Sequence, residues 1–102
     1  MKTAVIITGD DISPRLAPFF AHCNAVLISN GTGLVETIGN PARSGDDVCD
    51  IVLGQHVTRL ICGFIPEASK ALLQNAGVDV RLGSCARSVT DLIGDFMNLP
   101  LA

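Results

Sequence analysis

The sequence contains no tryptophan and no tyrosine, and its only aromatic residues are four phenylalanines. Basic residues are also scarce, because seven Lys and Arg are outnumbered by ten Asp and Glu, which gives a net charge of −3. Proteins that bind nucleic acids usually combine a basic surface with aromatic side chains that stack on the bases. The composition therefore argues against a nucleic-acid partner.

Long apolar runs are missing as well. No stretch approaches the roughly 20 apolar residues that a membrane-spanning helix needs, and the first residues lack the features of a signal peptide. We therefore expect a cytoplasmic protein with no membrane partner, in which the four cysteines are reduced thiols. None of the cysteines forms a C-x-x-C pair, so their spacing is not that of a zinc finger or a ferredoxin.

The most informative stretch of the chain predicts a strand, a helix and a second strand. Residues 57–62 and 78–82 are apolar or alternating runs, and residues 66–77 between them begin with proline and end with glycine, as helices often do. A unit of this length favours a right-handed crossover between parallel strands. We then expect Cys62 and Cys85, each just past a strand, to lie at the same edge of the sheet.

The N-terminal half predicts three further strands. Residues 3–8 form a β-branched run that suits a central strand buried on both faces. Residues 15–24 are interpreted as a loop. Residues 25–29 and 34–38 flank Asn30-Gly31, which is a strong hairpin signal between two apolar runs.

Two more helices are predicted from their capping residues. One begins after Ser44 and ends near Gly54, and the other begins at a capping box that starts with Ser88 and ends before Pro100. The apolar stripes expected for the three helices, in chain order, are Val48, Ile51 and Val52; Ala68, Ala71, Leu72 and Ala76; and Val89, Leu92, Ile93, Phe96 and Met97.

The predicted order is β-β-β-α-β-α-β-α, in one α/β domain that spans residues 1–102. We expect a mixed five-stranded sheet in which the first three strands form an antiparallel meander and the last two run parallel to the first. Helices would cover both faces of this sheet.

This topology gathers several polar and sulfur-containing side chains at one edge of the sheet, outside the carboxyl ends of the parallel strands, where ligands commonly bind. Thiolates and imidazoles suit metal–sulfur centres, and arginines complement the negative charge of a cluster. The residues expected at this edge are Asp10, Ser13, Arg15, His22, Cys23, Arg43, Cys62, Cys85 and Arg87. Cys49 is expected in the core, and His56, at the opposite edge, is given no function.

With this order the chain resembles the dinitrogenase iron–molybdenum cofactor biosynthesis family. The likeness rests on Ser13-Pro14-Arg15 after the first strand, on Cys62-Gly63-Phe64-Ile65, and on Gly83-Ser84-Cys85 before the last helix. It implies a ribonuclease H-like fold and a small protein that carries or processes metal–sulfur cluster precursors. Many members of the family have glycine at the position of Cys62, so ligation by this cysteine would be a trait of a subgroup.

The first functional hypothesis is a non-enzymatic carrier or scaffold for an iron–sulfur or molybdenum-containing metal–sulfur cluster, which it would exchange with a donor or acceptor protein. Cofactor contacts are expected from Ser13, Arg15, Arg43, Cys62, Gly63, Cys85 and Arg87, and the candidate metal ligands are Cys62, Cys85, Cys23 and His22.

Two alternatives stay open at this point. One is a thiol redox or interaction module in which Cys62 and Cys85 form a reversible disulfide, and the other is a plain domain with buried cysteines. A two-metal nuclease is rejected, because the first strand carries no carboxylate that could converge on a cation pair.

Overall fold

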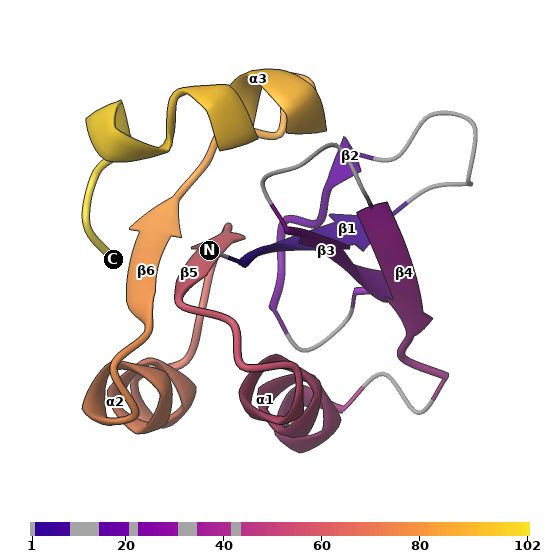
Figure 1. Cartoon of the computed structure of the whole chain (residues 1–102), viewed down its shortest axis with the longest axis vertical. Helices are drawn as coiled ribbons and strands as arrows, with labels where there is room; N and C mark the ends of the chain where they lie inside the picture. The colour runs from indigo at the N-terminus through magenta and orange to yellow at the C-terminus, as the bar shows by residue number, and fades with distance from the viewer. Residues whose placement is uncertain (1, 9–14, 21–22, 31–34, 42–43) are drawn as a thin grey trace.

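The computed structural model describes residues 2–8, 15–20, 23–30, 35–41 and 44–102. Among these residues, six strands form one sheet, and three α-helices and a short 3₁₀ helix flank it (Figure 1). The elements in chain order are β1 (Thr3–Thr8), β2 (Arg15–Leu16), β3 (Ala25–Ser29), β4 (Val35–Gly39), α1 (Gly45–Gly54), β5 (Arg59–Cys62), α2 (Glu67–Asn75), β6 (Asp79–Leu82), α3 (Val89–Gly94) and η1 (Phe96–Asn98).

The sheet has the order β4-β3-β1-β5-β6, and β2 pairs with β1 beyond this path. The pairs β1–β3 and β3–β4 are antiparallel, whereas β1–β5 and β5–β6 are parallel. The predicted meander and the parallel direction of the last two strands are therefore confirmed. β1 is the central strand, which agrees with its continuous run of buried apolar residues.

The prediction of five strands was wrong, because the segment interpreted as a loop contains β2. Leu16 and Arg15 of β2 lie opposite Ile7 and Thr8 of β1, and the backbone N–H of Ala17 donates to the carbonyl oxygen of Ile6 at 2.8 Å. A strand of two residues is too short to leave an alternating pattern in the sequence. Its pairing depends on β1 instead.

Helices cover both faces of the sheet, as predicted, with α1 and α2 on one face and α3 with η1 on the other (Figure 1). Each face has its own core. The α1–α2 core includes Ala4, Ile6, Val26, Val48, Val52, Leu60, Cys62 and Leu73, and the α3 core includes Val5, Ile7, Leu16, Ile61, Leu92 and Phe96. Alternate residues of β1 and β5 point into opposite cores, because successive side chains of a strand face opposite sides.

The caps of α1 and α3 confirm the sequence prediction, but the buried face of α2 does not. The hydroxyl oxygens of Ser44 and Ser88 accept hydrogen bonds from the third following backbone N–H, at 3.4 and 3.1 Å. In α2 the buried residue is Leu73, and Leu72 is exposed. The alanines expected beside Leu72 contribute little apolar area, so burial of Leu73 decides how this helix is rotated.

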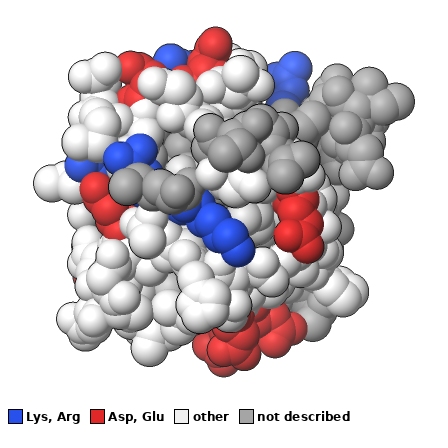
Figure 2. All heavy atoms as spheres, in the orientation of Figure 1, with Lys and Arg blue, Asp and Glu red and all other residues white. Residues whose placement is uncertain are grey.

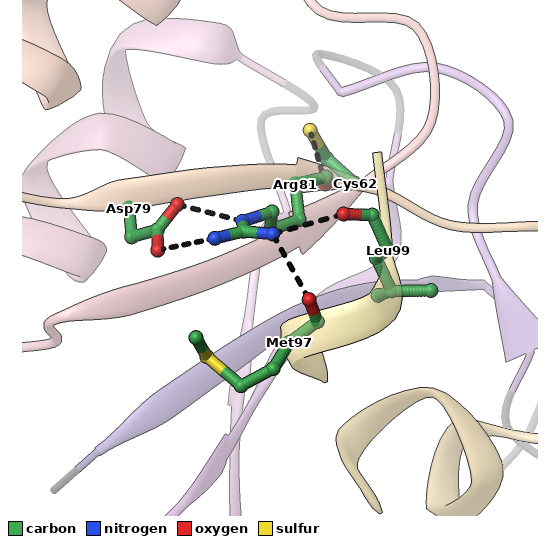
Figure 3. A network of polar contacts seen from close by, with 5 residues as sticks. All are labelled: Cys62, Asp79, Arg81, Met97 and Leu99. Carbon is green, nitrogen blue, oxygen red and sulfur yellow. Dashed lines mark hydrogen bonds and ion pairs between the residues drawn. The ribbon is translucent and has the colours of Figure 1, made fainter. Parts of the chain in front are cut away.

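The predicted third helix is shorter than expected. It ends at Gly94 and continues as η1, which leaves Met97 65% exposed instead of buried on the apolar face. The Arg81 side chain holds this end of the chain, because its Nη1 donates to the carbonyl oxygens of Leu99 at 2.9 Å and Met97 at 3.5 Å (Figure 3). The same guanidinium donates two hydrogen bonds to Asp79, at 2.9 and 3.1 Å.

Residues 100–102 lie along the outer edge of β6. The N–H of Leu82 donates to the carbonyl oxygen of Pro100 at 2.9 Å, and that of Ala102 donates to Val80 at 3.1 Å. This strap satisfies backbone groups that an edge strand would otherwise expose. None of the helices in the described ranges is both long enough and apolar enough to cross a membrane.

Candidate functional site

The carboxyl ends of the parallel strands β1, β5 and β6 meet at one edge of the sheet, and we refer to this edge as the strand-end edge. β2 contributes to it, because Arg15 forms an isolated antiparallel bridge with Ser88, directly after the loop that carries Cys85 and Arg87. β5 and β6 are joined there by a hydrogen bond from the N–H of Gly83 to the carbonyl oxygen of Cys62, at 3.0 Å. The structure thus brings Arg15 next to the Cys85–Arg87 segment, as the topology predicted.

Gly63 lies at this edge for a steric reason. The N–H of Phe64 donates to the carbonyl oxygen of Pro18 at 2.8 Å, which draws the two loops together. A Cβ atom on Gly63 would lie 2.7 Å from the same oxygen, closer than real Cβ contacts come. Gly63 therefore permits a close approach of two backbone segments.

Cys85 is a free, exposed thiol in a tight turn. The turn is closed by hydrogen bonds from the N–H of Ala86 to the Ser84 hydroxyl oxygen, at 3.2 Å, and from the N–H of Arg87 to the Ser84 carbonyl oxygen, also at 3.2 Å. Of the four cysteines, this one presents its sulfur to solvent. It is accessible to an incoming metal or reagent.

Arg87 forms an ion pair with Asp95 of its own chain. Its Nη1 donates to Asp95 at 2.9 Å, and Asn98 donates to the other carboxylate oxygen at 2.6 Å. These hydrogen bonds, first from Asn98 and then from Arg87, lower the pKa of Asp95. Arg15, in contrast, is exposed.

Cys62 is the last residue of β5, not a residue beyond it, and strand alternation places its side chain in the α1–α2 core. Its exposure is 0%, and its thiol donates a weak hydrogen bond to the carbonyl oxygen of Arg81 at 3.8 Å. Burial raises the pKa of the Cys62 thiol from its ordinary value of 9.0 to about 12. Ligation by this sulfur would require the core to open.

Cys23 and Cys49 are also buried in the α1–α2 core. The core position predicted for Cys49 is confirmed, and burial raises the pKa of its thiol. The side-chain amide of Asn40 donates to the carbonyl oxygen of Cys23 at 3.2 Å and approaches its sulfur at 3.6 Å. The remaining candidates, Ser13, His22, Arg43 and Asp10, lie outside the described residues.

No three His, Cys, Asp or Glu residues gather to hold a metal ion in the part of the chain that the structure describes. What these residues offer at the strand-end edge is a single exposed thiol and two arginines. On the face drawn in Figure 2, acidic side chains gather over α1, whose first turn carries Asp46 and Asp47, and basic side chains lie nearer the middle. Part of the negative charge of the protein therefore lies on α1.

An exposed aromatic pair, which the sequence analysis did not single out, lies beside this edge. Phe20 is buried, whereas its neighbour Phe19 packs edge to face against Phe64 with ring centroids 6.1 Å apart. Phe64 also lines a surface hollow of about 460 Å³, here called the Phe64 hollow. The described residues that line it are Gly63, Phe64, Ile65, Lys70, Leu82, Gly83 and Ala102.

The burial pattern predicts that a disulfide reagent titrates one thiol quickly in the native protein, and all four only after unfolding. The reason is that the thiolate is the reacting species, and burial both shields the other sulfurs and raises the pKa of Cys49 and Cys62. Cys85→Ser should abolish the fast reaction. Two fast thiols in the native protein would contradict the burial described here.

Comparison with known proteins places the chain in a family. The family described as "Dinitrogenase iron-molybdenum cofactor" matches residues 1–99. No curated protein sequence matches the chain.

Solved structures share the fold at low sequence identity. The apo form of the orange protein from Desulfovibrio gigas superposes with a TM-score of 0.87 at 19% identity, covering 99% of this chain and 92% of that one. A candidate NifB protein from Thermotoga, assigned to the DUF35 family, gives 0.77 at 24% identity, over 95% of this chain and 87% of that one. A candidate dinitrogenase from Methanococcus jannaschii gives 0.77 at 18% identity, over 100% and 92%. Since the family match covers nearly the whole sequence, this chain belongs to the dinitrogenase iron–molybdenum cofactor family.

Proposed function

We propose that this protein is a small non-enzymatic carrier or scaffold for a metal–sulfur cluster, either an iron–molybdenum cofactor precursor or a related iron or molybdenum cluster. The family match over residues 1–99 is the observation that carries the proposal. The cluster is cargo, which the protein receives from a donor and passes to an acceptor protein in the cytoplasm. A ribonuclease H-like arrangement of the sheet and helices, expected from the family resemblance, belongs to the same proposal.

The cargo would bind at the strand-end edge. Arg15 is exposed there and supplies positive charge to an anionic cluster, and Arg87 adds a second guanidinium from the neighbouring loop. Cys85 supplies an exposed thiol, and Gly63 has no side chain at the point where two loops meet. Ser13, Arg43 and His22 remain proposed contacts from outside the described residues.

The burial of Cys62 and Cys23 leads us to assign these two thiols to the core. This leaves at most one cysteine ligand among the described residues, so charge and hydrogen bonds would hold most of the cargo. It also weakens the alternative of a thiol redox module, because a buried thiol with a raised pKa is a poor nucleophile for disulfide exchange.

The test is reconstitution with a cluster source under anaerobic conditions, followed by visible absorption and metal analysis. The absence of Trp and Tyr makes charge-transfer bands easy to observe. We expect stoichiometric metal in the wild type and at least about a tenfold weaker affinity in Arg15→Glu, which corresponds to about 1.4 kcal/mol. Lys2→Glu makes the same change of charge just before β1, at the opposite edge, and should have no effect.

Cys85→Ser separates two modes of holding the cargo. Loss of the visible bands in this variant would establish a thiolate ligand, whereas bands that survive would show binding by charge and hydrogen bonds alone. Protein that stays colourless and free of metal after reconstitution would contradict the carrier proposal.

A further inference from the structure

Two of the four aromatic side chains of this protein are exposed together. Phe19 is 54% exposed and Phe64 is 67% exposed, although they come from different loops and contact each other edge to face, with an angle of 66° between the ring planes. Exposure of two adjacent aromatic rings to water is unfavourable, and a partner that covers the rings removes this unfavourable free energy. Aromatic side chains are enriched at the centres of protein interfaces.

The backbone holds this pair in a fixed position. Phe64 donates its N–H to the carbonyl oxygen of Pro18 at 2.8 Å, and Phe20 donates its N–H to the carbonyl oxygen of Phe64 at 2.9 Å. The absence of a side chain at Gly63 allows the two loops to approach this closely. Because the two loops are already held in place, binding of a partner to the rings would cost little conformational entropy of these loops.

The Phe64 hollow beside the pair has one charged side chain among its described lining residues. Its walls are mainly apolar, and the Lys70 side chain is the charged group. The Lys70 ammonium contacts Glu67 at 2.9 Å, but the carboxylate of Glu67 is 86% exposed. An exposed pair of this kind contributes little, so Lys70 can exchange this carboxylate for another at small cost.

We propose that Phe19, Phe64 and the Phe64 hollow form a docking surface for a partner-protein segment with an apolar side chain next to a carboxylate. The apolar side chain fills the hollow, and the carboxylate meets Lys70. A small molecule in the hollow would leave Phe19 uncovered, since Phe19 is not among the lining residues, whereas a protein surface covers both rings.

Charge complementarity supports a partner that brings a carboxylate, because Lys70 is the one charged side chain among the described residues that line the hollow. Gly63 joins this surface to the strand-end edge. The docking surface is inferred independently of the proposed function. If the partner is identified as a donor or acceptor of the cargo, that identification rests on the proposed function.

The probes are three acetylated and amidated hexapeptides, EELFEL, KKLFKL and EEASES, titrated into the isotope-labelled full chain and followed by amide chemical shifts. We expect EELFEL to shift the amides of Phe64, Ile65 and Lys70. The other two peptides, which lack the acidic or the apolar part, should bind at least tenfold more weakly.

Variants assign the effect to the surface. Phe19→Ala and Phe64→Ala should each weaken EELFEL by at least tenfold. Each variant also loses the edge-to-face contact between the rings, so we expect a small fall in the unfolding temperature and a protein that still unfolds cooperatively. Lys70→Glu should reverse the preference in favour of KKLFKL. Val35→Ala removes an exposed apolar side chain from the distant strand β4 and should leave every affinity unchanged.

Equal binding of EELFEL and EEASES, or no binding of any peptide, would overturn the proposal. So would a mass that rises with protein concentration and returns to that of the monomer in Phe64→Ala, because the occupant would then be a second copy of this chain. Cluster loading of Phe64→Ala is measured in parallel. Normal loading together with lost peptide binding supports a docking surface that is separate from the cargo site.

Discussion

Phe96→Ala should lower the free energy of unfolding by about 4 kcal/mol, the usual cost of removing a large buried aromatic side chain. Phe96 is 2% exposed and packs in the α3 core. It connects η1 to the sheet, because the guanidinium carbons of Arg59 and Arg81 lie 4.8 and 5.2 Å from its ring centroid. Truncation would leave a cavity and remove both cation–π contacts.

A loss of this size is a large part of the 5–15 kcal/mol that typically stabilises a domain. In a chain of this length it corresponds to a fall in the unfolding temperature of about 20 °C, measured by circular dichroism. Phe96→Leu keeps most of the apolar volume but has no aromatic face, so its loss should be about 1–2 kcal/mol. The matched control is Met97→Ala, at an exposed neighbouring position, and it should stay near the wild type. Equal stability of Phe96→Ala and Met97→Ala would contradict the packing described here.

The sequence predicted the elements whose cause is local. β1 and β3 have the predicted bounds, because a continuous apolar run and a turn signal do not depend on distant residues. The same holds for Ser44 and Ser88, whose hydroxyls cap the backbone three residues on, and for Gly77, whose φ of 91° ends the segment after α2.

Features that depend on tertiary contacts were predicted less well. β2 exists because β1 offers backbone partners, and the rotation of α2 depends on where Leu73 finds a core. The end of α3 depends on Arg81, which lies far away in sequence and binds the carbonyl oxygens of Met97 and Leu99. No local pattern contains these contacts.

At the strand-end edge, too, some features could be predicted from the sequence and others could not. Parallel strands bring their carboxyl ends together, so the proximity of Arg15 to the Cys85 loop could be predicted from topology. The different burial of Cys62 and Cys85 was not predicted. Cys62 is the last residue of β5, so strand alternation directs its side chain into the core, whereas Cys85 lies in a turn beyond β6.

The burial of Cys62 leads to a second large effect, a loss of stability at alkaline pH. The thiol has a pKa of about 12 in the folded protein, against 9.0 for an ordinary cysteine. Between these values the unfolded chain releases the proton and the folded chain keeps it. The stabilising contribution is therefore complete below about pH 9 and is lost as the pH rises toward 12, at about 1.4 kcal/mol for each pH unit.

Urea unfolding between pH 7 and 10.5 measures this slope, and we expect a loss of about 2 kcal/mol at the upper end. The chain has no tyrosine, so no phenol titrates in the same range. Cys62→Ala should be less stable at pH 7, because it leaves a small cavity, but its stability should change less with pH. Cys49, whose pKa is also raised, remains in this variant and accounts for a residual slope. The same pH dependence in the wild type and in Cys62→Ala would mean that the Cys62 thiol ionises freely in the folded protein, and it would return this sulfur to the set of available metal ligands.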